Sequence, residues 1–179
     1  MCFCPECCRG FKTYLKEKYG DIRELNRVWG RCYADFDEVE LPKTPNAVFS
    51  DFIDFRQFHL DKMTKEADRR LQLVRSLDAD HPVYLHVVPN TSGIFNALTG
   101  VDDFALAKGC DVFASTNFAQ PIWSVLTLSA GCGKTCYNVE CHVGAGSTGM
   151  HQRQITPAQL TKELLPQIGL GIRGFFPMI

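Results

Sequence analysis

The sequence lacks a long apolar run, a block of like charges and an internal repeat. A helix that spans a membrane needs roughly 20 consecutive apolar residues, so we expect no membrane-spanning helix in these residues. Lys and Arg do not cluster with aromatic residues, and the formal net charge is −1, so we predict that neither nucleic acid nor membrane is a partner. Without a repeat of 20 to 50 residues, the chain is not a solenoid.

The N-terminus, Met-Cys-Phe-Cys-Pro-Glu-Cys-Cys, lacks the charged and then apolar layout of a signal peptide. We therefore expect a cytoplasmic protein. The nine cysteines do not follow the spacing of a disulfide framework. Outside the N-terminal cluster, we predict reduced core residues at Cys32, Cys110, Cys132, Cys136 and Cys141.

The composition is that of a globular protein, with 45% hydrophobic and 22% charged residues over 179 positions, which predicts one domain. Apolar residues recur at helical spacing from Phe11 to Trp29 but are interrupted at Gly20-Asp21. This pattern predicts two helices, the first ended by Gly20 and the second capped by Asp21. A long loop over residues 31–49 and a long helix over Ser50–Leu77 follow.

Short apolar runs then alternate with helix-like stretches, as in parallel βα units. The last of these helices begins at Thr156-Pro157, with Gln159 completing a capping box, and we expect Pro166 to kink or end it. Four strands are predicted, over Val83–Val88, Asp111–Thr116, Thr135–Glu140 and Gly174–Met178.

Four parallel strands are half of the eight in a closed (β/α)8 barrel, which takes about 250 residues. We interpret the chain as an α/β partial TIM barrel. Its expected parts are a Cys-rich metal loop (1–10), helices with a long loop (11–81) and four βα-type units (82–179). The alternative is a complete small open α/β sheet.

The N-terminal cysteines form the pattern C-x-C-x-x-C at Cys2, Cys4 and Cys7. A tight turn around Pro5 would aim three thiolates at one tetrahedral Zn²⁺, with a fourth ligand from elsewhere in the protein. The alternative is three reduced cysteines in a loop. Another suggestive stretch, Gly131-Cys132-Gly133-Lys134-Thr135, is not a phosphate loop, because a strand follows it where that motif requires a helix.

Glu140 ends an apolar run and precedes a Gly-containing loop that begins Cys141-His142-Val143-Gly144. A carboxylate at the C-terminal end of a barrel strand lies on the face where these barrels carry catalysis. The alternative is a solvent-exposed residue or a salt bridge, and for His142 a polar loop residue.

These segments resemble glycoside hydrolase family 42, whose members are mostly bacterial β-galactosidases on a (β/α)8 barrel. The resemblance rests on the C-x-C-P-x-C segment, on Leu25-Asn26-Arg27-x-Trp29-Gly30, on Asp35-Phe36-Asp37-Glu38 and on Asp54-Phe55-Arg56-x-Phe58. Later matches are Glu140, Gly144, Pro157 and Gly171–Phe176.

The resemblance implies that the four strands are the fifth to the eighth of the barrel and that Glu140 is the nucleophile of a retaining glycosidase. It places the acid/base glutamate and the fourth zinc cysteine upstream of Met1, so the fragment alone is expected to be inactive. Cys2, Cys4 and Cys7 would hold a structural zinc. Asn117, Phe118 and His142 are the candidate substrate contacts.

The implied partner is a β-galactoside or a related oligosaccharide. The resemblance also implies a bacterial parent protein, for which a homo-oligomer is one expected assembly. Three positions depart from the family: Ala34 and Thr148 replace tryptophans, and Phe118 replaces a tyrosine whose hydroxyl could hydrogen-bond the nucleophile. Two alternatives therefore stay open. One is a non-catalytic, zinc-stabilised barrel domain, and the other is a related glycosidase for another sugar, such as an arabinopyranoside or a β-glucoside.

Overall fold

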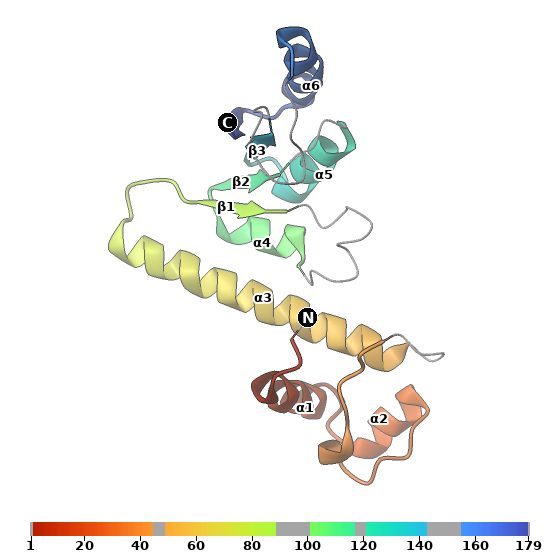
Figure 1. The fold of residues 1–179 in the computed structure, drawn as a ribbon. Helices are drawn as coiled ribbons and strands as arrows, with labels where there is room; N and C mark the ends of the chain where they lie inside the picture. The colour runs from red at the N-terminus through yellow and green to blue at the C-terminus, as the bar shows by residue number, and fades with distance from the viewer. Residues whose placement is uncertain (1, 45–48, 89–100, 117–120, 143–154, 179) are drawn as a thin grey trace. The chain divides into compact units, whose positions relative to one another are not determined.

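A computed structural model describes residues 2–44, 49–88, 101–116, 121–142 and 155–178. The chain divides into two compact units, Met1–Met63 and Thr64–Ile179, although one domain was predicted. The reason is the helix α3 (Ser50–Leu77; orange to yellow in Figure 1), which confirms the predicted long helix. Its first half supplies side chains to one hydrophobic core and its second half to another.

The first unit packs α1 (Pro5–Tyr19), α2 (Ile22–Trp29), the 3-10 turn η1 (Phe36–Glu38) and the start of α3 around one core. The two predicted helices are confirmed, and the Asp21 side chain caps α2. The loop predicted over residues 1–10 is wrong from Pro5 on, because proline fits the first turn of a helix and α1 begins there. The core consists of Phe11, Leu15, Leu25, Trp29, Phe36, Val39 and Phe55.

A buried carboxylate ties the three main helices of this unit together. Asp54, only 3% exposed, accepts hydrogen bonds from Lys18 Nζ at 2.6 Å, from the Tyr19 hydroxyl at 2.6 Å and from Trp29 Nε1 at 3.0 Å. A buried charge is tolerated when it is paired and hydrogen-bonded in this way. Burial and the adjacent carboxylate raise the pKa of Tyr19.

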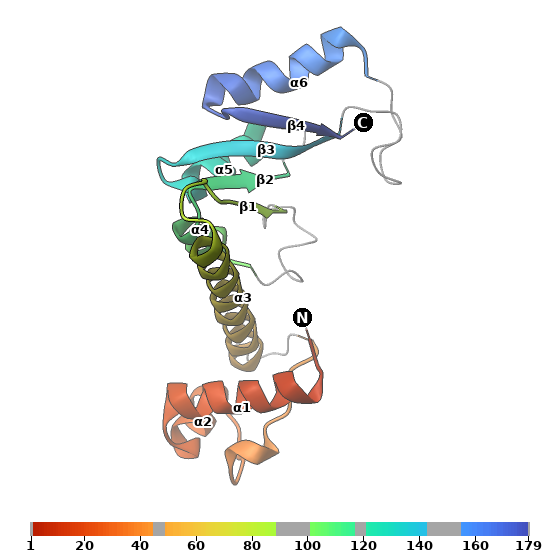
Figure 2. The same cartoon turned by 90° about the vertical axis from the view of Figure 1, so that its left-hand side faces the viewer.

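The second unit contains a four-stranded sheet in the order β1-β2-β3-β4, with every neighbouring pair parallel. The strands are β1 (Tyr84–Val87), β2 (Val112–Ser115), β3 (Thr135–His142) and β4 (Gly174–Met178). All four predicted strands are confirmed, and β3 runs two residues further than predicted. Figure 2 shows the strands side by side in chain order.

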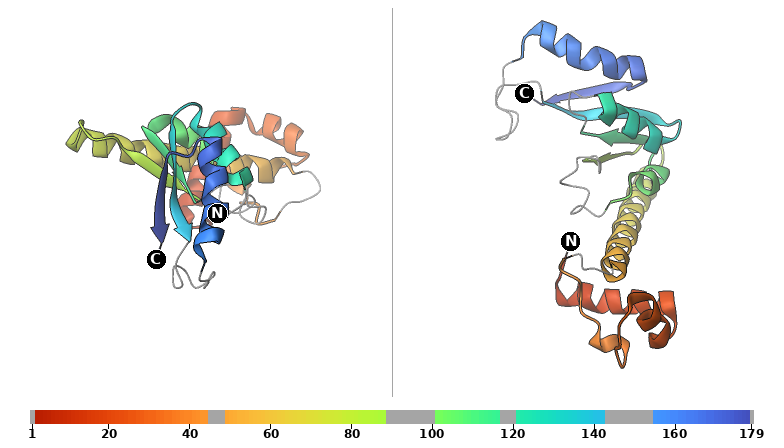
Figure 3. Two further views of the ribbon diagram at one scale, coloured as in Figure 1. Left: turned by 90° about the horizontal axis from the view of Figure 1, so that it is seen from above. Right: turned by 90° about the vertical axis from the view of Figure 1, so that its right-hand side faces the viewer.

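One face of this sheet packs against helices α4 (Asp103–Gly109), α5 (Pro121–Gly131) and α6 (Pro157–Leu170), seen from two further sides in Figure 3. The predicted capping box at Thr156 is confirmed. Pro166 does not end α6, which continues to Leu170. The core on this face consists of Leu71, Val87, Leu106, Ala107, Cys110, Phe113, Ala130, Cys136 and Ile172.

The opposite face carries the alternate residues of each strand. Three aromatic rings meet there, with the Phe176 ring centroid 6.4 Å from that of Tyr84 and 6.1 Å from that of Tyr137. His86 lies on the same face as Tyr84, two residues further along β1. This face therefore combines apolar rings with polar groups nearer the strand ends.

The glycine-rich stretch before β3 is a turn, as predicted. A Cβ on Gly131 would lie 2.4 Å from the Cys136 sulfur, so only glycine fits there. Lys134 Nζ donates to three backbone carbonyls at the end of α4, those of Ala107, Lys108 and Cys110, at 2.7 to 2.9 Å. This lysine caps a helix C-terminus instead of binding a phosphate.

All nine cysteines are free thiols. Cys110, Cys136 and Cys141 are buried, as predicted, but Cys32 and Cys132 are exposed, so the prediction was wrong for these two. Cys32 follows the C-terminal turn of α2, and Cys132 occupies the tight turn after α5 with a positive φ of 48°. Among the described residues, no helix is long and apolar enough to cross a membrane.

Candidate active site and thiolate cluster

Glu140 lies near the carboxyl end of β3, where the strand contains a β-bulge. Asn138 pairs with Phe175 and Cys141 pairs with Pro177, so β3 holds one more residue than β4 over this interval. In a regular strand, residues 138 and 140 would share a face. A bulge re-aims the side chains that follow it, which is a recurring device beside active sites.

The contacts on each side of β3 show the effect of the bulge. The Asn138 side chain reaches α6, where its Nδ2 donates to Gln167 Oε1 at 3.0 Å. The Glu140 carboxylate instead meets Thr116, at the end of the neighbouring β2, and His86 on β1, the next strand in the sheet order. Glu140 therefore points away from the helix-covered core.

Asn138 also supports the bulge from within β3. Its Oδ1 accepts the backbone N–H of Glu140 at 3.4 Å, while its Nδ2 is held by Gln167, and both side chains are buried. Gln167 is fixed in turn by donating to the Glu163 carbonyl at 3.1 Å. Helix α6 thus fixes the backbone that presents Glu140.

Thr116 and His86 line the site next to Glu140. The Thr116 hydroxyl donates to Glu140 Oε2 at 2.6 Å, and His86 Nε2 lies 2.8 Å from Thr116 Oγ1 and 3.7 Å from Glu140 Oε2. Phe118 lacks the hydroxyl of the family's tyrosine, but the Thr116 hydroxyl lies beside Glu140 at the end of β2.

The site has a partly solvated carboxylate beside a buried threonine and an exposed histidine. The Glu140 side chain is 25% exposed, Thr116 is 3% exposed and the His86 side chain is 36% exposed. Burial lowers the pKa of His86 although the Glu140 carboxylate acts in the opposite direction, so the imidazole is neutral at pH 7. A carboxylate held by neutral donors is suited to nucleophilic or general-base chemistry.

Two of the predicted substrate contacts, Asn117 and Phe118, lie outside the described residues, as does Thr148. His142 belongs to β3, but its side chain is outside the description. Neither His86 nor Thr116 was predicted as a site residue. The available signal was their position near the ends of the two predicted strands that precede the one bearing Glu140.

The predicted metal ligands come together in the first unit. The sulfur atoms of Cys2, Cys4 and Cys7 all lie within 4.8 Å of one another. A zinc ion with sulfur ligands at about 2.3 Å keeps those sulfurs about 3.8 Å apart, so a small movement closes the set. Cys8 lies outside it, because its thiol faces the Phe3 carbonyl at 3.7 Å.

The environment of the cluster favours a thiolate at Cys4 and opposes one at Cys7. Hydrogen bonds, first from the backbone N–H of Cys7, lower the pKa of Cys4 to about 7 at the start of α1. Burial raises the pKa of Cys7, but the Lys62 ammonium donates to its sulfur at 3.1 Å and opposes that rise. Cys4 is the N-cap of α1, a position where a helix favours negative charge.

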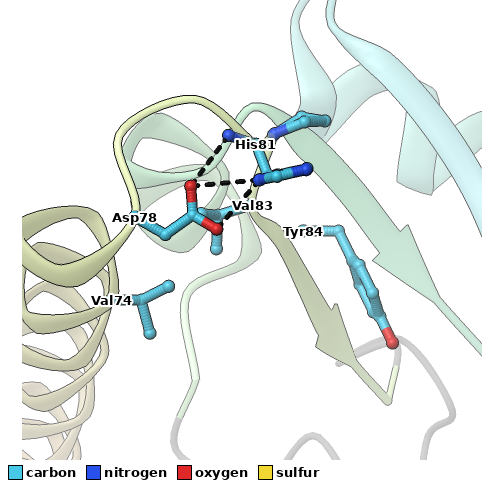
Figure 4. A pocket seen from close by; sticks show the side chains of 6 residues that line it. Val74, Asp78, His81, Val83 and Tyr84 are labelled. Carbon is cyan, nitrogen blue, oxygen red and sulfur yellow. Dashed lines mark hydrogen bonds and ion pairs between the residues drawn. The ribbon is translucent and has the colours of Figure 1, made fainter.

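A shallow pocket at the other end of the second unit's sheet is not the candidate site. It lies where α3 connects to β1 and is lined by Val74, Asp78, His81, Pro82, Val83 and Tyr84 (Figure 4). Asp78 accepts hydrogen bonds from the backbone N–H groups of Asp80 and His81 and lies 2.9 Å from the His81 ring. These contacts order a connection at the amino end of the strand.

The family profile described as beta-galactosidase, glycoside hydrolase family 42, matches residues 1–144. The chain belongs to glycoside hydrolase family 42. The match includes the thiolate cluster, the Asp54 network, His86, Thr116 and Glu140. Family 42 membership therefore covers both candidate sites.

Individual family 42 relatives agree with this assignment. A beta-galactosidase, BgaA, from Thermus sp. is 34% identical over 123 residues, which are 64% of this chain and 18% of that protein. Beta-galactosidase LacZ from Heyndrickxia coagulans is 31% identical over 127 residues, 67% of this chain and 18% of that protein. The chain thus spans about a fifth of the length of these curated relatives.

Solved structures of the family show the same fold. The beta-galactosidase from the psychrophilic Marinomonas ef1 superposes with a TM-score of 0.82 at 18% identity, over 99% of this chain and 31% of that one. The four parallel strands are therefore part of a (β/α)8 barrel, as predicted. The alternative of a complete open sheet is not supported.

Proposed function

We propose that the protein of which these residues form a part is a retaining β-glycosidase, acting on β-galactosides, with Glu140 as its nucleophile. One observation carries the proposal: a bulge at the carboxyl end of a barrel strand presents Glu140 to a hydroxyl donor and away from the core. Family 42 membership and the names of the relatives support a galactoside substrate.

The proposed reaction has two steps. The Glu140 carboxylate attacks the anomeric carbon as the bond from that carbon to the glycosidic oxygen breaks. The leaving oxygen takes a proton from a carboxylic acid elsewhere in the longer polypeptide. Water then attacks the glycosyl ester, loses its proton to that second carboxylate, and releases the sugar with its configuration retained.

Residues 1–179 alone are expected to be inactive in this scheme. The family resemblance places the acid/base glutamate before the Cys-rich segment, and a retaining pair must stand about 5 to 5.5 Å apart. Without that group, neither the leaving oxygen nor the attacking water has its proton donor or acceptor. Activity of the isolated chain on an unactivated galactoside would contradict this point.

Covalent labelling tests the proposal. The full-length protein is incubated with a 2-deoxy-2-fluoro-β-galactoside carrying a good leaving group and is then digested and analysed by mass spectrometry. A labelled peptide containing Glu140 is expected, and Glu140→Gln should abolish both labelling and hydrolysis. Glu66→Gln, at an exposed position on α3, is the matched control and should label like the wild type.

The substitutions at Ala34, Phe118 and Thr148 keep two other functions open: a glycosidase for another sugar and a non-catalytic barrel domain. A panel of 2-fluoro sugars with galacto, gluco and arabinopyranosyl configurations distinguishes them. Faster labelling by another sugar than by the galactoside would keep the mechanism and change the specificity. No labelling by any member would favour a non-catalytic barrel domain.

We also propose a structural zinc held by Cys2, Cys4 and Cys7, with a fourth cysteine from upstream sequence. The clustered sulfurs, the low pKa of Cys4 and the neighbouring Lys62 support it. When bound, zinc would cross-link the start of α1 to the rest of the polypeptide and would take no part in catalysis. Metal analysis of the full-length protein should find about one zinc per chain.

A further inference from the structure

A row of three side chains crosses the carboxyl ends of β1, β2 and β3. His86 Nε2 is 2.8 Å from Thr116 Oγ1, and Thr116 Oγ1 is 2.6 Å from Glu140 Oε2. The backbone holds this row in place, since Thr116 N–H donates to the Val87 carbonyl at 3.1 Å. Each side chain thus comes from a separate strand of one sheet.

The number of hydrogens available for donation fixes the direction of the two hydrogen bonds in this row. An ionised carboxylate only accepts hydrogen bonds, and a threonine hydroxyl has a single hydrogen to donate. Thr116 gives that hydrogen to Glu140, so its oxygen must accept from His86. His86 is then the tautomer that carries hydrogen on Nε2.

We propose that Thr116 and His86 are positioning residues for Glu140. His86 orients the Thr116 hydroxyl, and the hydroxyl holds Oε2 of the Glu140 carboxylate. This inference rests on the proposed role of Glu140 as the nucleophile. It assigns a reason to the strand-end threonine and histidine, neither of which contributes to the hydrophobic core.

The chemistry explains why neutral donors are suitable. A protonated histidine 3.7 Å from Glu140 would pair with the carboxylate and weaken it as a nucleophile, whereas neutral donors orient the carboxylate without neutralising its charge. The Thr116 hydroxyl donates to Oε2 and so fixes the orientation of the Glu140 carboxylate toward the anomeric carbon.

Substitution of Thr116 gives the decisive kinetic test on the full-length protein. Thr116→Val keeps the shape but removes the donor, and kcat/KM should fall about 10- to 100-fold, as for the loss of a hydrogen bond to a charged group. The acidic limb of the kcat/KM profile should move to higher pH, because the carboxylate loses a hydrogen-bond donor. Thr116→Ser should restore most of both.

His86 variants test the hydrogen bond from His86 to Thr116. His86→Gln can still donate from its side-chain amide and should retain most activity, whereas His86→Leu should resemble Thr116→Val. Thr127→Val is the matched control, because it removes a hydroxyl of a similar pair, 2.6 Å from Ser115 Oγ, on the helix-covered face. It should leave the pH profile unchanged.

Histidine NMR tests the geometry without relying on activity. In the full-length protein labelled with ¹⁵N-histidine, the signal absent from His86→Leu should report the Nε2–H tautomer at pH 7 and should shift in Thr116→Val. An imidazolium or an Nδ1–H tautomer would overturn the inference. If the wild type is labelled by a 2-fluoro sugar but Thr116→Val keeps wild-type kinetics, the positioning role is refuted. If the wild type is never labelled, the nucleophile proposal fails instead.

Discussion

Replacing Asn138 by leucine should destabilise the second unit and misdirect Glu140. The change removes the donor to Gln167 Oε1 at 3.0 Å and the acceptor of the Glu140 N–H at 3.4 Å. Gln167 is 2% exposed, so its carbonyl oxygen cannot turn to water. A buried polar group left without a partner costs about 1 to 3 kcal/mol, which gives an expected loss of about 2 to 3 kcal/mol.

A double-mutant cycle separates the pair from its surroundings. Gln167→Leu alone should cost about 2 kcal/mol, because it removes the acceptor 3.0 Å from the buried Asn138 Nδ2. The double variant should cost only about 1 kcal/mol, since two apolar side chains replace two hydrogen-bonded ones. The expected coupling is therefore about 3 to 4 kcal/mol. Thr161→Ala, at an exposed hydroxyl of α6, is the control and should change stability by less than about 0.5 kcal/mol.

Urea unfolding of the full-length protein gives these energies, and labelling rates with the 2-fluoro sugar give the effect on Glu140. The double variant should recover stability but not labelling, because the Asn138 oxygen that supports the bulge is still missing. Additive costs, with a coupling below about 0.5 kcal/mol, would refute the role of the Asn138–Gln167 pair. Normal labelling in either Asn138 variant would refute its role in presenting Glu140.

Asp54→Ala should lower the unfolding free energy by about 3 kcal/mol or more, because the buried Trp29 indole and the Tyr19 hydroxyl lose their acceptor and Lys18 loses its ion pair, whereas Tyr19→Phe should cost about 1 kcal/mol by urea unfolding. The free energy of unfolding should fall as the pH drops below about 6.5, because the pKa of His86 is lowered in the folded state and the unfolded chain therefore binds the proton first. Urea titrations at several pH values measure this dependence, and His86→Gln should make it weaker. Cys4→Ser should lose zinc by elemental analysis and melt at a lower temperature, whereas Cys8→Ser should keep its metal.

The sequence predicted much of the first unit, because its signals are local. Gly20 and Asp21 mark a helix end and a helix start through backbone groups within a few residues. Asp54 was recognised only as part of a motif. Its role as acceptor for three side chains depends on how separate helices pack, which spacing along the chain does not specify.

The division into two units could not be read from periodicity. The apolar stripe of the Ser50–Leu77 helix is continuous in sequence, yet Phe55 packs in one core and Leu71 in the other. The stripe specifies a buried face but not which neighbours cover it. Met63 and Val74 belong to this stripe but are 43% and 46% exposed, so the apolar pattern does not predict burial at these two positions.

By itself, the sequence determined the order of strands and helices, the family, the clustering of three thiols near the chain start and the position of Glu140 at a strand end. Alternation alone would turn Glu140 to the same face as Asn138. Only the tertiary structure decided that Glu140 faces Thr116 and His86. The extra residue in β3 and the hydrogen bond from Asn138 to Gln167 produce that orientation. A bulge depends on pairing with the next strand, and that pairing is a long-range contact which local pattern does not encode.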